Sequence, residues 1–154
     1  QFQTHIKPVG QPSPKKQRDG SRIKNIQKKG FNTIALTARG KSMLKSTQRE
    51  LARQKIDFMG VPYTADQTLL KEKKKCKAGT TPPCYTKLQF TRGVMYSNGS
   101  KKGWMLRQLL EKCDDYKHIV FVDDRADNIE SMSESYTPVS DVNMHLFLYL
   151  RHRD

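Results

Sequence analysis

The sequence predicts an α/β fold, with a Rossmann-like parallel sheet and flanking helices. Short apolar runs that suit buried strands alternate with amphipathic helical patterns along most of the chain. Such alternation favours parallel strands joined by right-handed crossovers. Polar residues follow three of the runs, and the carboxyl ends of parallel strands are where open α/β sheets bind ligands. We therefore expect these polar residues to gather at one edge of the sheet.

The clearest strand pattern covers residues 118–122. It contains Ile-Val-Phe-Val, which is typical of a strand buried on both faces. Asp123 and Asp124 follow at once, and Asp127 comes one turn later. Adjacent carboxylates repel each other and suit a hard cation such as Mg²⁺, which takes one or two carboxylates with waters and phosphate oxygens. The alternative is a polar turn in which an Asp caps the helix expected at 128–135.

The first half of the chain predicts a helix, a strand and a second helix. A helical pattern lies within residues 13–29, and residues 31–37 suit a second buried strand. That strand ends in Thr37, with Arg39 two residues later. The helix expected at 42–55 places its leucines on one stripe, as a helix that covers a sheet does.

The region 57–92 is harder to assign. Phe58 suits the start of a short strand, and the lysine-rich run 69–77 suits a solvated face or loop, because blocks of like charge are usually exposed. The alternative is a basic insertion that lies over a site for an anionic substrate.

A third strand is expected at 93–97, and Lys101 and Lys102 then open an amphipathic helix. A lysine at a helix start opposes the macrodipole. Such a conflict between a local rule and the sequence points to function, whereas the alternative is an exposed lysine at a tolerable position. Residues 144–150 suit a final strand in their first half, with a terminal helix as the alternative.

The composition indicates a single basic domain. The 154 residues include 29 Lys and Arg against 15 Asp and Glu, a net charge of +14. This charge predicts attraction to polyanions, namely nucleic acid, acidic membrane or phosphorylated ligands. No zinc-finger spacing and no aromatic-rich RNA-binding strand pattern appears, so the charge predicts affinity without sequence readout. Nucleic acid is therefore the weaker partner prediction.

The cysteines do not make a disulfide framework, since there are only three. Cys76 and Cys84 could pair across a seven-residue loop, or remain free thiols. The sequence contains no signal peptide pattern and no apolar run of the length that spans a bilayer. It begins with Gln1 instead of Met, which indicates a processed or truncated chain.

The three strand ends together suit phosphoryl transfer. They supply the Thr37 hydroxyl, the Lys102 ammonium and the acids Asp123, Asp124 and Asp127. A hydroxyl and an ammonium can hold phosphoryl oxygens, and acids can hold the Mg²⁺ that offsets charge on the transferred group.

These stretches resemble motifs two, three and four of the haloacid dehalogenase (HAD) superfamily. The matching features are Ile-Ala-Leu-Thr-Ala-Arg, Lys102 at the head of a helix, and Ile-Val-Phe-Val-Asp-Asp. Within the superfamily, the sequence most resembles an uncharacterised bacterial phosphatase-like HAD family. Other similar stretches are 23–30, 47–51 with 56–58, and 98–103. The resemblance covers roughly residues 20–135 and implies a Mg²⁺-dependent phosphatase, in either a bacterial cytoplasm or a secreted or periplasmic location.

The resemblance also implies roles for individual residues. Thr37 would bind a phosphoryl oxygen, Lys102 would neutralise the nucleophile and the phosphate, and Asp123 would ligate Mg²⁺. Asp124 or Asp127 would be the second acidic partner for the metal. Arg39 and Lys101 would be cations that bind the substrate. Lys101 is the alternative to Lys102, which we prefer because it directly precedes Gly103.

One motif of the family is absent. HAD enzymes carry Asp-x-Asp at the end of their first strand, where the first Asp is the nucleophile and the second the general acid–base. Asp19 is the only acid before Thr37. We therefore expect the first strand and the nucleophile in an N-terminal segment outside this chain. The alternative is a catalytically inactive HAD-like module whose basic surface binds nucleic acid, a lipid headgroup or a phosphoprotein.

The predicted organisation is one HAD-like domain over residues 1–154. Its core would comprise 20–56 and 93–150, with 57–92 as an insertion, small cap or loop region. Because caps largely determine HAD substrates, the phosphorylated substrate is left open between small and macromolecular.

Overall fold

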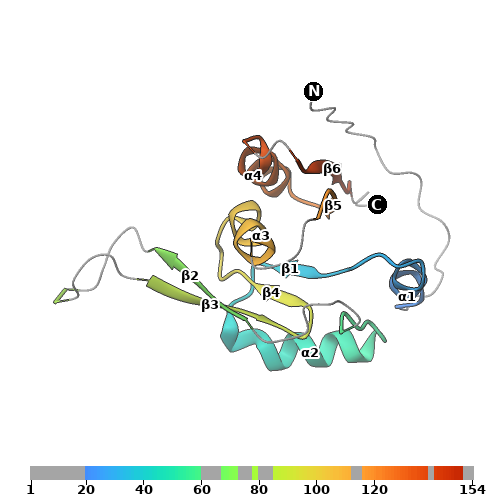
Figure 1. Ribbon diagram of the computed structural model, residues 1–154. Coiled ribbons are helices and arrows are strands. Elements are labelled where there is room, and N and C mark those ends of the chain that lie inside the picture. Colours follow the sequence, from blue (N-terminus) through green and yellow to red (C-terminus); the bar gives the residue numbers. More distant parts are fainter. Residues whose placement is uncertain are drawn as a thin grey trace. The chain divides into compact units, whose positions relative to one another are not determined.

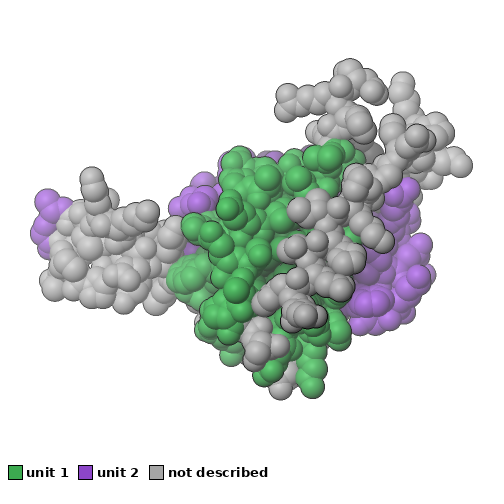
Figure 2. All heavy atoms as spheres, turned by 90° about the horizontal axis from the view of Figure 1, so that it is seen from above, with its two compact units in different colours: residues 1–16, 100–154 green, residues 17–99 purple. Residues whose placement is uncertain are grey.

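The computed structural model describes six stretches of the chain: 20–59, 67–72, 78–79, 85–111, 116–138 and 141–150. They form helices and strands that confirm the α/β class. The chain divides into two compact units (Figure 2). Residues 17–99 make the N-terminal unit, and residues 1–16 with 100–154 make the C-terminal unit. Each unit has its own sheet, and the prediction of a single domain stays a prediction.

The N-terminal unit contains a four-stranded sheet of mixed direction (Figure 1). β1 is parallel to β4, whereas β3 is antiparallel to both β4 and β2. In spatial order the strands are β1 Ala35–Thr37, β4 Val94–Tyr96, β3 Tyr85–Thr91 and β2 Gln67–Glu72. The prediction of a parallel sheet is therefore correct only for the β1–β4 pair in this unit.

Two helices complete the N-terminal unit, α1 (Ser21–Lys28) and α2 (Leu44–Arg53), the latter preceded by a 3₁₀ turn at Lys41–Met43. Both present apolar side chains to a small core. The buried members of this core are Phe58, Val94 and Tyr96, and the partly buried hydrophobic residues packed on them are Ile23, Ala35, Leu44, Leu51 and Ile56. The leucine stripe predicted for the second helix is thus the face that packs inward.

Two strand assignments in this unit were wrong. The strand predicted from residue 31 begins only at Ala35, and Phe31 is 62% exposed, because only the last three residues have a partner strand. Phe58 starts no strand; it is buried in the core, where Gly93 at φ +72° approaches it closely enough that a Cβ would lie 2.4 Å from its carbonyl oxygen.

The first residues of the lysine-rich run form a strand and not a loop, and the prediction that the run is a solvated face stays a prediction. These first residues belong to β2, and the region 57–92 contributes two strands to the sheet, β2 and β3. Cross-strand pairing can hold a charged strand that a local pattern assigns to a loop. Residues 13–19 of the first helical pattern, residues 73–77 of the run, and all three cysteines lie outside the described residues.

The C-terminal unit contains a parallel pair of strands, β5 (His118–Asp123) and β6 (Asn143–Leu148). Helix α4 (Ala126–Tyr136) follows β5 and packs on both strands, and α3 (Lys102–Leu110) packs on α4 (Figure 1). Gly103 allows the close approach of α3 to α4, since a Cβ there would lie 2.4 Å from the Ser131 carbonyl oxygen. The strands and helices predicted over 93–150 are confirmed with shifts of a few residues.

The prediction that residues 118–122 are buried on both faces was wrong. Val120 and Val122 are 64% and 58% exposed, whereas Phe121 and Asp123 are buried. Side chains alternate along a strand, and α4 packs on these strands. An unbroken apolar run therefore does not by itself establish two covered faces.

Candidate functional site

A buried ion pair joins the end of β5 to the start of α3. The Lys102 Nζ atom lies 2.6 Å from Asp123 Oδ2, and the two side chains are 12% and 6% exposed. Lys102 is the first residue of α3 and Asp123 the last residue of β5. The carboxylate partner offsets the unfavourable position of a cation at a helix start. The structure therefore brings together the predicted lysine and the first predicted acid.

Two further donors bind the Asp123 carboxylate. Oδ1 accepts the Arg125 backbone N–H at 3.0 Å and the Asn128 amide Nδ2 at 3.0 Å. Burial of Asp123 acts to raise its pKa, but the hydrogen bonds from Asn128, Lys102 and the Arg125 amide outweigh it and hold the pKa below the ordinary value of 3.8. Asp123 is therefore a carboxylate at neutral pH.

This carboxylate keeps capacity for one more partner. An ionised carboxyl group offers about four lone-pair positions. Arg125 and Asn128 occupy two on Oδ1, and Lys102 occupies one on Oδ2. Mg²⁺ usually takes one or two protein carboxylates and fills its other positions with water and phosphate oxygens. Asp123 fits such a cation as a single ligand.

The other two predicted metal ligands do not join Asp123. Arg125 binds Asp127 with two hydrogen bonds, Nε to Oδ1 at 2.9 Å and Nη2 to Oδ2 at 2.7 Å, and this pair is exposed. The hydrogen bond from Arg125 is the main cause that lowers the pKa of Asp127. Asp124 is exposed. Among the described residues, no three Asp, Glu, His or Cys side chains gather at a spacing that would hold a metal ion.

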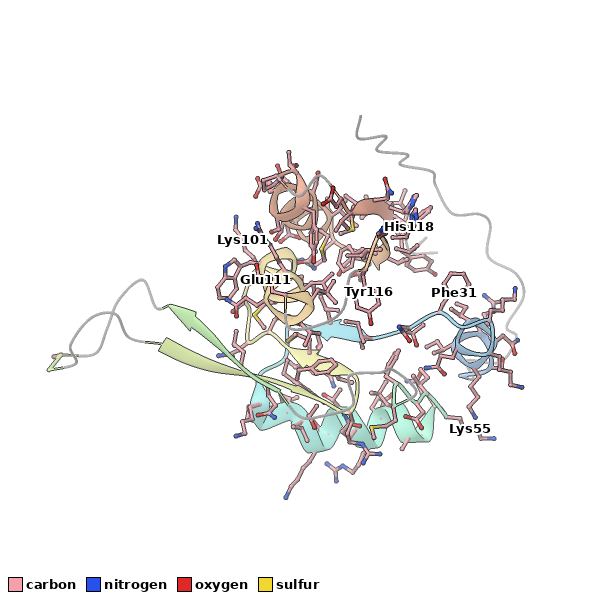
Figure 3. The ribbon with its side chains drawn as sticks, viewed as in Figure 1. Phe31, Lys55, Lys101, Glu111, Tyr116 and His118 are labelled. Atoms are coloured by element: carbon pink, nitrogen blue, oxygen red, sulfur yellow. The ribbon has the colours of Figure 1, made fainter. Side chains whose placement is uncertain are left out.

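The two neighbouring lysines have different surroundings. Lys101, labelled in Figure 3, is exposed. Its Nζ atom lies 3.5 Å from Oε2 of Glu134, an exposed residue on α4. Lys102, one residue later, is buried against Asp123. Lys102, the lysine preferred in the sequence analysis, therefore contacts Asp123 at the end of β5. Lys101 makes only a surface contact, with Glu134.

In the N-terminal unit, Thr37 ends β1 and lies in a hydrogen-bonded turn. Its Oγ1 accepts the Arg39 backbone N–H at 3.2 Å. Its carbonyl oxygen accepts both the Ser97 N–H and the Ser97 hydroxyl, each at 2.9 Å. A hydroxyl that accepts one hydrogen bond still carries its own proton to donate, so Thr37 can serve as a donor to an oxygen ligand.

Arg39 reaches from the same turn toward α2. Its Nη1 donates to the Thr47 hydroxyl at 3.0 Å, and Thr47 is buried. Asn98 closes the other side of the turn, where a Cβ on Gly40 would lie 2.7 Å from its Oδ1 atom. These contacts fix the backbone around Thr37 with neutral hydrogen bonds and one guanidinium.

The predicted site residues thus form two groups. Lys102 and Asp123 are in contact in the C-terminal unit, and Thr37 and Arg39 share one turn in the N-terminal unit. That the two groups converge on one site stays a prediction.

Sequence analysis missed two polar residues that hold these groups. Ser97 was assigned only to a strand, and Asn128 only to a helix. Each had a detectable signal, because Ser97 directly follows β4, the strand beside Thr37, and Asn128 lies in the first turn after Asp123.

The fold and these contacts define an α/β protein with a buried lysine–carboxylate pair at a strand end. The chain belongs to a family described as "Protein of unknown function (DUF2608)", whose profile matches residues 4–154. No curated protein and no solved structure matches the chain. The family description states no activity, so the HAD resemblance stays a hypothesis. In the parts that the structure describes, no helix is both long enough and apolar enough to cross a bilayer.

Proposed function

We propose that this protein is a Mg²⁺-dependent phosphohydrolase of the HAD type, with a Rossmann-like core. The observation that supports it most is the buried pair of Lys102 and Asp123 at the carboxyl end of β5. A buried ion pair is by itself weak evidence of function, because it can be purely structural. Here the carboxylate also keeps an unused acceptor position, and it lies where α/β sheets bind ligands.

Each residue has a distinct role in this proposal. An ammonium group carries three donors, so Lys102 can bind Asp123 with one and direct others at a phosphoryl oxygen and a nucleophilic carboxylate. Thr37 donates its hydroxyl proton to a phosphoryl oxygen. Asp123 holds Mg²⁺ as its one protein carboxylate, and water and phosphate oxygens fill the other positions. When bound, the metal offsets negative charge on the phosphoryl group.

The reaction would follow the aspartyl-phosphate route. A carboxylate attacks the phosphorus atom, the bond from phosphorus to the ester oxygen breaks, and a general acid protonates the leaving oxygen. Water then hydrolyses the acyl phosphate and restores the carboxylate. Residues before Thr37 contain no Asp-x-Asp, so the proposal places the nucleophile outside residues 1–154.

Hydrolysis of p-nitrophenyl phosphate by the full-length protein tests this function. We expect activity that EDTA abolishes and Mg²⁺ restores. Asp123→Asn keeps the shape of the side chain but removes its charge, so we expect kcat/KM to fall about 10²–10³-fold, as when one electrostatic contact to a transition state is lost. Glu134→Gln is the matched control, since it removes an exposed acid of the same unit.

Two results would count against the phosphatase. One is wild-type activity in Asp123→Asn, with circular dichroism showing that the variant is folded. The other is no activity of the full-length protein on p-nitrophenyl phosphate or on phosphopeptides, with Mg²⁺ present. Activity on phosphopeptides alone would instead identify the substrate as macromolecular.

A further inference from the structure

The positive charge of the chain is concentrated in the N-terminal unit. Residues 17–99 contain 18 Lys and Arg against 5 Asp and Glu, a net charge of +13. The remaining residues contain 11 against 10 and are close to neutral. A polyanion would therefore be attracted to the N-terminal unit.

Within this unit, α2 and the turn before it carry cations at intervals of four residues. These residues are Lys41, Lys45, Arg49 and Arg53, here called the cationic ridge, and all four are exposed. Residues four apart lie on one face of a helix, about 6 Å apart along its axis. The opposite face of α2 carries Leu44 and Leu51, which pack on the core. Figure 3 shows nitrogen-tipped side chains on the side of α2 away from the strands.

This arrangement is unfavourable for the helix alone. Like charges four residues apart on a helix repel each other, and cations in the first turn oppose the macrodipole. Glu50 neutralises only one cation of the ridge, Arg53, whose Nη2 donates to both Glu50 carboxylate oxygens at 2.9 Å. Across the described residues, no acid forms an ion pair with the other three cations. Local rules broken without a local compensation point to a functional surface.

We propose that the cationic ridge binds the phosphate backbone of single-stranded nucleic acid. A row of cations about one helical turn apart, which drifts slowly around the helix, matches a ligand whose charges also repeat along a line, and successive phosphates of a strand do so at a comparable spacing. A single phosphorylated headgroup or amino acid would contact one end of the row. The surface contacts backbone phosphates, so it binds without sequence preference.

A membrane surface fits the ridge less well. Helices that lie in a membrane interface turn an apolar face toward the lipid. The apolar face of α2 is already packed on the sheet. This binding surface does not depend on the proposed phosphatase activity, and either can be present without the other.

Fluorescence anisotropy with labelled oligo-thymidylate and the full-length protein tests the proposal. Single-stranded binding weakens with salt at a log–log slope of about −0.7 per phosphate contact. The triple variant Lys41→Gln, Lys45→Gln, Arg49→Gln should therefore reduce the slope by about 2 and weaken binding about a hundredfold at roughly 0.1 M salt.

The matched control removes the same charge from α1 and its C-cap residue, in the same unit. Its substitutions are Lys24→Gln, Lys28→Gln and Lys29→Gln, at positions that are also exposed. For the control we expect the log–log slope of binding against salt to differ from that of the wild type by no more than the value of about one phosphate contact. Equal losses in the two triple variants, both folded by circular dichroism, would show that net charge alone attracts the oligonucleotide and would overturn the proposal.

Other ligands separate the remaining outcomes. Poly-glutamate or phosphatidylserine vesicles that bind as tightly as the oligonucleotide, with the same dependence on the ridge, would replace nucleic acid with an acidic peptide or a membrane. No binding of the oligonucleotide by the wild-type protein at low salt would also overturn the proposal.

Discussion

The two units of this protein differ in their net charge and in whether charged side chains are buried. The C-terminal unit is nearly neutral and buries one opposite pair, Lys102 and Asp123. The N-terminal unit carries almost all of the net charge at exposed positions, and its buried polar side chains are neutral among the residues that are described: Thr47, Thr91 and Ser97. Burying a charge is costly unless it is paired, whereas a solvated charge costs little and is screened by salt. Stability should therefore depend on one charge pair in the C-terminal unit and on packing and neutral hydrogen bonds in the N-terminal unit.

The largest expected effect is that of Lys102→Met. This substitution keeps most of the side-chain volume but leaves Asp123 buried without its cation, which should cost about 3–5 kcal/mol in the free energy of unfolding measured with urea. Lys101→Met is the control, and because its ion pair is exposed it should cost less than about 1 kcal/mol. Equal losses in the free energy of unfolding for the two variants would show that the buried pair of Lys102 stabilises the fold no more than the exposed pair of Lys101.

Gly103→Ala should have the next largest effect. The added Cβ would lie 2.4 Å from the Ser131 carbonyl oxygen and 2.6 Å from the Ser135 hydroxyl, so α3 must move away from α4. We expect a loss of about 1–3 kcal/mol in thermal unfolding. Adding Ser135→Ala should not restore stability, because the backbone carbonyl remains. Full recovery in that double variant would show that only the hydroxyl collides.

The third prediction concerns acid. The folded-state pKa of Asp123 lies below its ordinary value of 3.8, so the carboxylate stabilises the folded protein above that pH. This contribution is lost as the pH falls through the folded-state pKa. The difference in urea midpoint between the wild type and Asp123→Asn should therefore be largest at neutral pH and shrink on acidification. A difference that grows in acid would mean that folding raises the pKa of Asp123 instead of lowering it.

A smaller effect is expected from Ser97→Ala in the N-terminal unit. The hydroxyl of Ser97 is buried and donates to the Thr37 carbonyl. Loss of one neutral hydrogen bond should cost about 0.5–1.5 kcal/mol in urea unfolding, with no change in the dependence of stability on pH. A shift in the acid transition would show that the turn at Thr37 is coupled to a titrating group.

The smallest effect is expected from Arg53→Gln. Arg53 and Glu50 are an exposed pair on α2, and such pairs contribute little because water screens the two charges. The change in thermal midpoint should be small and should decrease further with added salt. A large loss that salt does not reduce would mean that Arg53 stabilises the helix by packing.

The candidate site was predictable in part. Lys102 was found because a cation at a helix start breaks a local rule, and Asp123 because it follows an apolar run. Asp127 could not be judged in the same way, since its two hydrogen bonds to Arg125 depend on how the side chains fold against each other. Asn128 was missed for a similar reason: its bond to Asp123 depends on how α4 leaves β5.

The sequence by itself determined the order of helices and strands over 93–150 and the ends of β1 and β5, because these follow from short-range periodicity and the chemistry of turns. Only the tertiary structure decided that β2 and β3 join the sheet as antiparallel strands and that Val120 and Val122 are exposed. Strand pairing and burial depend on neighbours that are distant along the chain, and a local pattern does not contain that information.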